Sequence, residues 1–329
     1  MIRVALLSQW HVHAKDYARQ AHENPAIEIA AVWDERMDRG QAWATDLGVP
    51  FYPDLDTLLN RSDLDGVIVN TPTVMHRDVI IRAAEAGKHI FSEKVLALTT
   101  DDVQAIFHAV DRTNVHLMLS LPRLSDPCNR YAEQAVQEGL LGELTSVRCR
   151  VAHNGAVPTA GGHSGWLPDD FFDDSQTGGG AMIDLGAHPI YLTNRVAGAA
   201  KSVTACLTSY FHRGVDDNSI ILVEYQSGAL GVIETGFVSS GSPFLFELYG
   251  TAGSLLIEEA QVRIKSQHFN SQDWVSPQLP ARLPTPMEQW TARIEDQIDP
   301  SISRDDMYRL SEINQAALRS SQQGIRVIL

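Results

Sequence analysis

The first 120 residues alternate short apolar runs with stretches in which apolar residues recur at helical spacing. The runs are rich in β-branched residues and predict strands, and the stretches between them predict amphipathic helices. Strands alternating with helices form a parallel sheet with helices on both faces, so we expect a doubly wound α/β domain of the Rossmann type. The expected strands span residues 2–7, 27–33, 66–70, 89–91 and 115–119, and the expected helices span 12–23, 36–47, 78–86 and 101–112.

The pattern changes from about residue 144, where β-rich runs follow one another with only turn pairs between them. This succession predicts a large, mostly antiparallel open sheet in an α+β domain. One helix is expected near residues 181–197, and a last helix carries Met307, Leu310, Ile313 and Ala317 on one face. We expect domains at residues 1–121 and 122–329. The expected strands span residues 147–151, 201–210, 219–225, 229–238, 244–249, 254–257 and 261–265.

Composition and charge exclude several classes of protein. The length of 329 residues suits two domains. A net charge of −15, from scattered acids, repels a phosphate backbone and argues against nucleic acid as a partner. No apolar run approaches the roughly 20 residues that a membrane helix needs, and the chain opens on a strand rather than a leader, so we expect a cytoplasmic protein. Cys128, Cys149 and Cys206 lack the spacing of a disulfide framework or a cysteine metal site.

The stretch Ser8-Gln9-Trp10-His11-Val12-His13 follows the first strand, where a dinucleotide-binding domain places its glycines. It has no glycine at positions 8, 10 or 13, so the backbone cannot approach a pyrophosphate in the usual way. The helix expected to start there still offers free amides to an anion. We hypothesise that Ser8, Trp10, His11 and Val12 hold the pyrophosphate by side chain and amide, with His11 or His13 as a polar or charged contact.

Asp34 ends the second strand, at the usual place and spacing of the acid that binds a dinucleotide. Such an acid accepts hydrogen bonds from both hydroxyls of the adenosine ribose and repels a 2′-phosphate. The position therefore favours NAD over NADP, although Arg36 nearby is a weak signal in the opposite direction. The alternative is that Asp34 only caps the next helix.

Further polar residues follow the third and fourth strands. Asn70, Thr71 and Pro72 come directly after the third strand, and small polar groups at this edge can line a ribose or nicotinamide pocket. Lys94 follows the fourth strand and is expected to project into the same crevice, where a lysine can take part in proton transfer. An ordinary turn and a solvated surface lysine are the alternatives.

The segment Gly178-Gly179-Gly180-Ala181-Met182-Ile183-Asp184-Leu185-Gly186-Ala187-His188 places an acid and a histidine four residues apart. On a helix, Asp184 and His188 would share one face. A carboxylate that orients an imidazole makes a suitable base for the proton of an alcohol. The pair could instead be structural, or could bind a metal with help from His153, His163 or His212. We expect no metal.

Together these motifs resemble the Gfo/Idh/MocA family of NAD(P)-dependent oxidoreductases. The likeness covers essentially the whole chain, and the motifs occur in the family's order. Residues 70–76 are similar to its TPxxxH stretch, 86–89 to AGKH, 92–94 to EKP, 138–143 to the crossover between domains, 178–188 to GGGxxxDxGxH and 248–253 to the YGTxG turn.

The resemblance implies hydride transfer from a secondary alcohol of a polyol, cyclitol, sugar or sugar derivative to the nicotinamide of NAD. It implies that His188 is the general base, that Lys94 hydrogen-bonds the reacting oxygen, and that Asp184 orients substrate and imidazole. Arg123 is implied to face the nicotinamide and Trp166 to lie near cofactor and sugar. We expect residues 152–172, which include His153, to set specificity. His76 and Glu93 complete the expected cofactor contacts, and a homodimer or homotetramer through the C-terminal sheet is implied.

Three departures from the family pattern stand out: the glycine loop is absent, Val95 replaces the proline after Lys94, and Tyr191 replaces an acid. The family's Lys-Pro bond is often cis, but for Val95 we expect trans, since cis costs about 2.5 to 4 kcal/mol. Two other functions are therefore considered. One is redox-neutral glycoside cleavage or elimination through transient oxidation. The other is a non-catalytic ligand sensor, against which the presence of Lys94, Asp184 and His188 argues.

Overall fold

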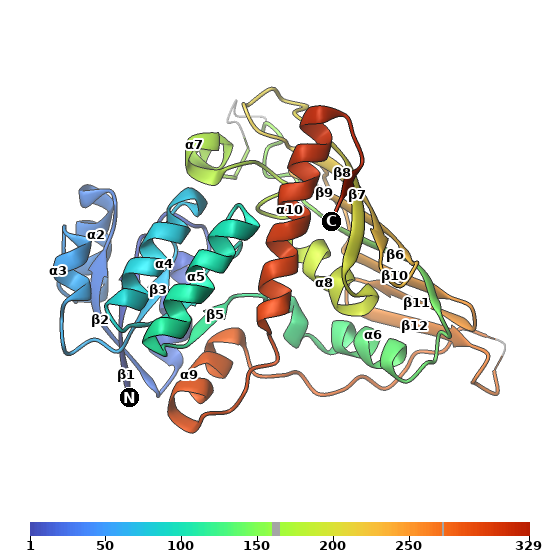
Figure 1. Ribbon diagram of the computed structural model, residues 1–329, viewed down its shortest axis with the longest axis horizontal. Helices are drawn as coiled ribbons and strands as arrows, with labels where there is room; N and C mark the ends of the chain where they lie inside the picture. The colour runs from blue at the N-terminus through green and yellow to red at the C-terminus, as the bar shows by residue number, and fades with distance from the viewer. Residues whose placement is uncertain (160–164, 272) are drawn as a thin grey trace. The chain divides into compact units, whose positions relative to one another are not determined.

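A computed structural model describes residues 1–159, 165–271 and 273–329 of the chain (Figure 1). Its contacts divide the chain into two compact units. Unit 1 comprises Met1–Ser120 and Pro284–Ser303, and unit 2 comprises Leu121–Leu283 and Arg304–Leu329. The expected domain boundary after residue 121 stays a prediction. Among the described residues, no helix has both the length and the apolar character needed to cross a membrane.

Unit 1 is built on a five-stranded parallel sheet with the order β2-β1-β3-β4-β5. This confirms the predicted Rossmann-type sheet. The order reverses between β1 and β3, so the loops after these two strands open side by side at the carboxyl edge of the sheet. The strands are β1 (Ile2–Leu7), β2 (Ile27–Trp33), β3 (Gly66–Val69), β4 (His89–Ser92) and β5 (Leu117–Leu119). The helices between them are α1 (Ala14–Glu23), α2 (Met37–Leu47), α3 (Leu55–Leu59), η1 (Thr73–Met75), α4 (His76–Glu85) and α5 (Thr100–Thr113).

A later helix, α9 (Pro286–Asp296), also belongs to unit 1. It starts at a capping box formed by Thr285 and Glu288, and its Trp290 is fully buried. The Trp290 ring centroid lies 5.9 Å from that of Phe91 on β4. The sequence did not predict this helix, because the neighbouring prolines indicate a linker.

Unit 2 is built on an eight-stranded sheet with the order β12-β11-β10-β6-β9-β8-β7-β13. Its neighbouring strands pair antiparallel except β6 and β9, which pair parallel. This confirms the prediction of a mostly antiparallel sheet. The strands are β6 (Leu144–Ala152), β7 (Ala200–Thr208), β8 (Asn218–Tyr225), β9 (Leu230–Gly236), β10 (Leu245–Gly250), β11 (Gly253–Glu258), β12 (Gln261–Ser266) and β13 (Val327–Ile328). The helices are η2 (Pro122–Ser125), α6 (Pro127–Gln137), η3 (Asp169–Phe172), α7 (Asp174–Thr177), α8 (Ala187–Ala197) and α10 (Arg304–Gln323).

Helices α8 and α10 pack on each other and on the sheet of unit 2 (Figure 1). The apolar face predicted for the last helix is confirmed, because Met307, Leu310, Ile313 and Ala317 of α10 are all buried. Exposed side chains alternate with buried ones along β8, which is the pattern of a strand with one face in the core and one face outside.

Candidate active site

The loop after β1 keeps a glycine-like turn without a glycine. Ser8 has φ of 71°, in the left-handed region that residues with a Cβ seldom adopt. Its hydroxyl oxygen accepts hydrogen bonds from the Trp10 amide at 3.1 Å and from Arg39 Nη2 at 3.2 Å. The His11 amide donates to the Asn70 carbonyl at 3.2 Å, which joins this loop to the loop after β3. Serine therefore makes the turn that glycine usually makes.

Helix α1 begins at Ala14, two residues later than expected, and His13 is its N-cap residue. The four residues expected to hold a pyrophosphate thus lie in the loop that precedes the helix. Trp10 and His11 are buried there, whereas Val12 is 41% exposed. Their contact with a cofactor stays a prediction.

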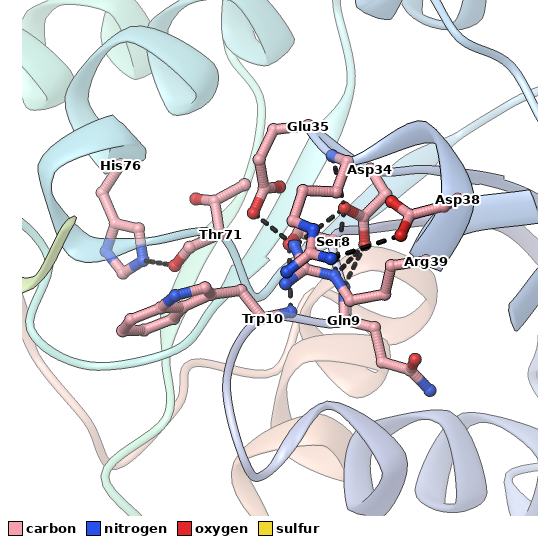
Figure 2. Close-up of polar contacts among 10 residues, drawn as sticks. Ser8, Gln9, Trp10, Asp34, Glu35, Asp38, Arg39, Thr71 and His76 are labelled. Atoms are coloured by element: carbon pink, nitrogen blue, oxygen red, sulfur yellow. Dashed lines mark hydrogen bonds and ion pairs between the residues drawn. The ribbon is translucent and has the colours of Figure 1, made fainter. Parts of the chain in front are cut away.

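Asp34 lies at the end of β2, as expected, but its carboxylate is already engaged (Figure 2). It accepts hydrogen bonds from the amides of Gln9 and Arg36, each at 2.8 Å. Arg39 from the first turn of α2 binds the same carboxylate through Nε and Nη2, with a shortest distance of 2.8 Å. Arg39 also pairs with Glu35. Partial burial opposes the charge of Arg39, but these two acids nevertheless raise its pKa.

The sequence analysis missed Arg39 and considered Arg36 instead. The Arg36 side chain bonds Asp38, at 3.2 Å, and not Asp34. An arginine five residues after an acid that ends a strand is the signal that could have indicated the pair. Asp34 therefore presents a carboxylate whose charge is largely balanced inside unit 1.

The loop after β3 contains buried polar atoms that lack protein partners. Among the described residues, neither side-chain amide atom of Asn70 has a hydrogen-bond partner, and the Thr71 hydroxyl has none either. Such groups are costly to bury unless a ligand or water satisfies them. They lie directly after β3, where a dinucleotide is expected to bind, and their unused donors and acceptors fit the hydroxyl and amide groups of NAD.

His76 bridges two loops of unit 1. Its Nδ1 lies 2.7 Å from the Val95 carbonyl oxygen and its Nε2 lies 3.2 Å from the Thr71 carbonyl oxygen. Burial lowers the pKa of His76 to about 4, so the ring is neutral and carries one proton, which the shorter distance assigns to Nδ1. His76 therefore donates its one hydrogen bond to the segment after β4, and its unprotonated Nε2 only lies beside the Thr71 carbonyl in the loop after β3.

Glu93 is the centre of a buried polar cluster. Its Oε2 lies 3.2 Å from His13 Nδ1 and 3.7 Å from His11 Nδ1, and it also accepts a hydrogen bond from the Tyr17 hydroxyl. Its Oε1 accepts from the Lys94 amide at 3.0 Å and lies 3.8 Å from Lys94 Nζ. Burial alone would raise the pKa of Glu93, but the charges of His11, His13 and Lys94 hold it well below its usual range. Glu93 is therefore a permanent carboxylate.

The peptide bond between Lys94 and Val95 is cis, so the expectation of a trans bond was wrong. That expectation considered the bond in isolation. In the folded chain both residues are buried, the Val95 carbonyl is bonded to His76, and the Lys94 amide is bonded to Glu93. The bond that precedes Val95 is therefore cis although Val95 is not a proline.

In unit 2, Asp184 does not share a helix face with His188, so this expectation was wrong. Residues 181–186 form turns, and α8 begins only at Ala187. The amides of Gly180 and Met182 donate to the Asp216 carboxylate at 2.9 and 2.8 Å, and the Ala181 amide donates to the Asp216 carbonyl. This anchor holds the glycine segment in a non-helical path, and burial raises the pKa of the Asp216 carboxyl.

His188 is buried on the first turn of α8, where its Nδ1 lies 2.8 Å from the Tyr191 hydroxyl. That hydroxyl oxygen also accepts a hydrogen bond from the Arg123 amide at 3.3 Å. Burial raises the pKa of Tyr191 well above its usual range, so the group stays protonated. A neutral hydroxyl therefore supports His188 at the position where the resemblance expected an acid.

The other expected substrate residues also lie in unit 2. The Arg123 guanidinium lies 4.7 Å from the centroid of the Phe244 ring. The His153 ring stacks on Phe237, with centroids 5.0 Å apart, and lies 4.7 Å from the ring of Trp166. Trp166 is 57% exposed and donates a hydrogen bond through Nε1 to the Asn154 side-chain oxygen at 3.1 Å.

The alternative metal site at Asp184 and His188 is not among the ligand clusters that the described residues form, and His163 lies outside those residues. The predicted catalytic residues are divided between the units, since Lys94 belongs to unit 1 whereas Asp184 and His188 belong to unit 2.

Family models match both parts of the chain. A model of the oxidoreductase family with an NAD-binding Rossmann fold matches residues 10–121, and a model of the GFO/IDH/MocA C-terminal domain matches residues 129–256. The two matches together cover more than half of the chain.

Individual proteins are similar over long stretches. The scyllo-inositol 2-dehydrogenase (NAD+) of Bacillus subtilis (strain 168) is 29% identical over 75% of this chain and 70% of its own length. The crystal structure of GenD2 from gentamicin A biosynthesis, in complex with NAD, has a TM-score of 0.85 at 24% identity and covers 100% of this chain and 96% of that one. Levoglucosan dehydrogenase, in complex with NADH and levoglucosan, has a TM-score of 0.83 at 21% identity and covers 99% of both chains. At these identities the two structures support the fold.

Proposed function

Because the chain belongs to the Gfo/Idh/MocA family of oxidoreductases with an NAD-binding Rossmann fold, we propose that it transfers a hydride between NAD and a secondary alcohol of a polyol, cyclitol, sugar or sugar derivative. The observation that carries this proposal is the presence of Lys94, Asp184 and His188 in a chain that matches the models of both domains. The inositol and levoglucosan dehydrogenases among the relatives support the class of substrate.

The residues of unit 1 fit NAD. The partnerless side chains of Asn70 and Thr71, and the turn at Ser8, support a dinucleotide along the loops after β1 and β3. In this proposal Asp34 binds the adenosine ribose and Ser8, Trp10, His11 and Val12 contact the pyrophosphate. Pro72 and Glu93 are proposed to shape the nicotinamide end, and His76, which lies between the Thr71 and Val95 carbonyls, to contact the cofactor beside them. The bound nicotinamide supplies the hydride acceptor.

His188 is proposed to accept the proton of the alcohol at Nε2. To do so while neutral, the ring must carry its proton on Nδ1 and donate it to the Tyr191 oxygen, 2.8 Å away. That oxygen has two lone pairs, so it can also accept the bond from the Arg123 amide. Tyr191 thus selects the tautomer of the base and holds the ring in place.

Lys94 is proposed to donate a hydrogen bond to the reacting oxygen, and Asp184 to orient the substrate and the imidazole. His188 would take the alcohol's proton, and bound NAD would supply the acceptor for the hydride. Arg123, His153 and Trp166 are proposed to contact the substrate on the unit 2 side. The aromatic pair of His153 and Trp166 suits the apolar face of a sugar ring.

We also propose that the chain forms a homodimer or homotetramer through the open face of the unit 2 sheet. Ile220 and Leu222 on β8 and Leu230 on β9 are 49%, 53% and 58% exposed. Apolar side chains gathered on one sheet face are typical of an association surface. Light scattering of the purified protein, with Leu222→Glu as the variant, tests this arrangement.

The test of function is turnover with NAD and a panel of polyols, inositols, sugars and anhydrosugars, measured as NADH absorbance. Net NADH from at least one substrate is expected. Product formation from a glycoside with tightly bound NAD and no net NADH would indicate redox-neutral chemistry instead. Ligand binding without turnover across the panel, and unchanged in Lys94→Ala, would indicate a sensor.

A further inference from the structure

Three potential metal ligands of unit 1 converge between the loop after β1 and the end of β4. His13 Nδ1 lies 3.2 Å and His11 Nδ1 lies 3.7 Å from Glu93 Oε2. One ligand atom from each of the three residues lies within 4.8 Å of the others. Ligands on a tetrahedral Zn²⁺ ion are about 3.4 Å apart when the bonds are about 2.1 Å long. The three atoms are therefore spaced for one ion with small side-chain movements.

We propose that His11, His13 and Glu93 form a binding site for a divalent transition metal ion, with Zn²⁺ as the best match. Two imidazole nitrogens and one carboxylate oxygen are donors that Zn²⁺ and its neighbours in the first transition row prefer, whereas Mg²⁺ and Ca²⁺ prefer oxygen ligands alone. Three protein ligands leave a fourth position on the ion for water. This site goes beyond the proposed hydride transfer and does not depend on it.

The surrounding residues orient the carboxylate as they would in a metal site. The Tyr17 hydroxyl bonds Glu93 and lies 2.8 Å from the Ser120 hydroxyl, so Tyr17 is held from both sides. The Lys94 amide occupies Glu93 Oε1, which leaves Oε2 facing the two imidazoles. Contacts of this kind around a ligand fix its direction and strengthen metal binding.

Access to the site is from the His13 side. The side chains of His11 and Glu93 are 4% and 1% exposed, whereas that of His13 is 40% exposed. An ion can therefore reach the cluster without opening the core. Binding through His11 Nδ1 gives up a long hydrogen bond from the His13 amide, at 3.2 Å, which is a modest loss beside a metal bond.

The experiment measures metal binding alone, without NAD or substrate. The full chain is stripped with a chelator and dialysed against Zn²⁺, and bound metal is counted by mass spectrometry. About one Zn²⁺ per chain is expected, and bound Co²⁺ is expected to give the visible absorption of a four-coordinate site. His13→Ala and Glu93→Gln are each expected to weaken Zn²⁺ binding at least about tenfold.

His108→Ala is the matched control, because His108 is an exposed histidine on α5 of the same unit. It is expected to bind Zn²⁺ as the unaltered protein does. Circular dichroism establishes that each variant is folded, and His13→Ala, at a half-exposed position, serves where Glu93→Gln does not fold. Less than about 0.2 Zn²⁺ per chain, or equal affinity in His13→Ala and His108→Ala, would overturn the proposal. Neither result would affect the proposed hydride transfer.

Discussion

The loop after β1 in unit 1 and the Tyr191 position in unit 2 both depart from the family pattern, and the fold accommodates them differently. In the loop, Ser8 adopts the conformation usual for glycine, and the imidazoles of His11 and His13 lie beside the Glu93 carboxylate. At residue 191 a neutral hydroxyl stands where the family has an acid, and it forms hydrogen bonds with His188 and the Arg123 amide but carries no charge. A backbone requirement can thus be met by another residue type, whereas a missing charge is not replaced.

The largest expected effect comes from removing the proposed proton-transfer groups of either unit. Lys94→Ala and His188→Ala are each expected to lower kcat at least about a hundredfold, the usual scale for a lost acid or base. Steady-state rates with a substrate found in the panel measure this. His108→Ala should retain full activity. A loss of kcat below about tenfold in both variants would contradict the assignment of Lys94 and His188 to proton transfer.

The second effect is that the stability of unit 1 depends on pH because of His76. Its pKa is about 4 in the folded chain, against 6.5 for an ordinary histidine, so the unfolded chain binds more protons between these values. The contribution of neutral His76 to the free energy of unfolding is therefore complete above about pH 6.5 and is lost as the pH falls towards 4. At pH 5 the loss is about 2 kcal/mol. The free energy of unfolding in urea, measured between pH 7 and 5 for the unaltered protein and for His76→Asn, tests this expectation. If the free energy of unfolding fell equally with pH in both proteins, His76 would not be the cause.

The third effect concerns the cofactor specificity that we expect Asp34 and Arg39 to determine together. Removing Arg39 leaves the Asp34 charge unbalanced, so Arg39→Ala is expected to raise the ratio of kcat/KM for NAD over NADP about tenfold, through repulsion of the 2′-phosphate. Asp34→Asn should shift the ratio the other way. Arg36→Ala is the control, since its side chain bonds Asp38 instead. An unchanged ratio in Arg39→Ala would show that the pair does not select the cofactor.

The fourth effect tests the hydrogen bond between His188 and the neutral Tyr191 hydroxyl. Tyr191→Phe removes one hydrogen bond, worth about 1 kcal/mol, and should lower kcat about fivefold with little change in the KM for NAD. Its pH–rate profile should also move, because the ring loses the partner that selects its tautomer. Tyr210→Phe, at an exposed position of unit 2, is the control. An unchanged profile in Tyr191→Phe would reduce this tyrosine to a packing residue.

The smallest effect isolates the turn at Ser8. Ser8→Ala and Ser8→Gly lose the same hydroxyl contacts, but only glycine accepts φ of 71° without cost. Ser8→Gly is therefore expected to be about 1 kcal/mol more stable than Ser8→Ala in urea unfolding. Equal stability of the two variants would mean that the loop changes its conformation, so that residue 8 does not need a positive φ.

The sequence predicted the sheets because their signals are local. Strands β1 and β2 have the expected bounds, since runs such as residues 27–33 combine β-branched residues with clear ends. The helix expected near residues 181–197 begins only at Ala187, because Asp216, distant in the sequence, binds the amides of the glycine segment. Such a tertiary contact leaves no trace in local periodicity.

The sequence predicted which residues lie at the candidate site, but not which of them bind each other. Strand ends identified Asp34 and Lys94, because the carboxyl edge of a parallel sheet is where ligands bind. The engagement of Asp34 by Arg39 depends on the direction of a helix turn and a side-chain conformation, which composition and spacing do not specify. The meeting of His11, His13 and Glu93 depends likewise on the adjacency of two loops about 80 residues apart.

The placement of α9 with unit 1 has a consequence for synthesis of the chain. Unit 1 is assembled from two separate stretches, and Trp290 fills space beside β4 that residues 1–120 alone leave empty. During translation unit 1 therefore stays incomplete until residues 284–303 have been made. Phe91 therefore gains its contact with Trp290 only after residues 121–283 of unit 2 have been translated.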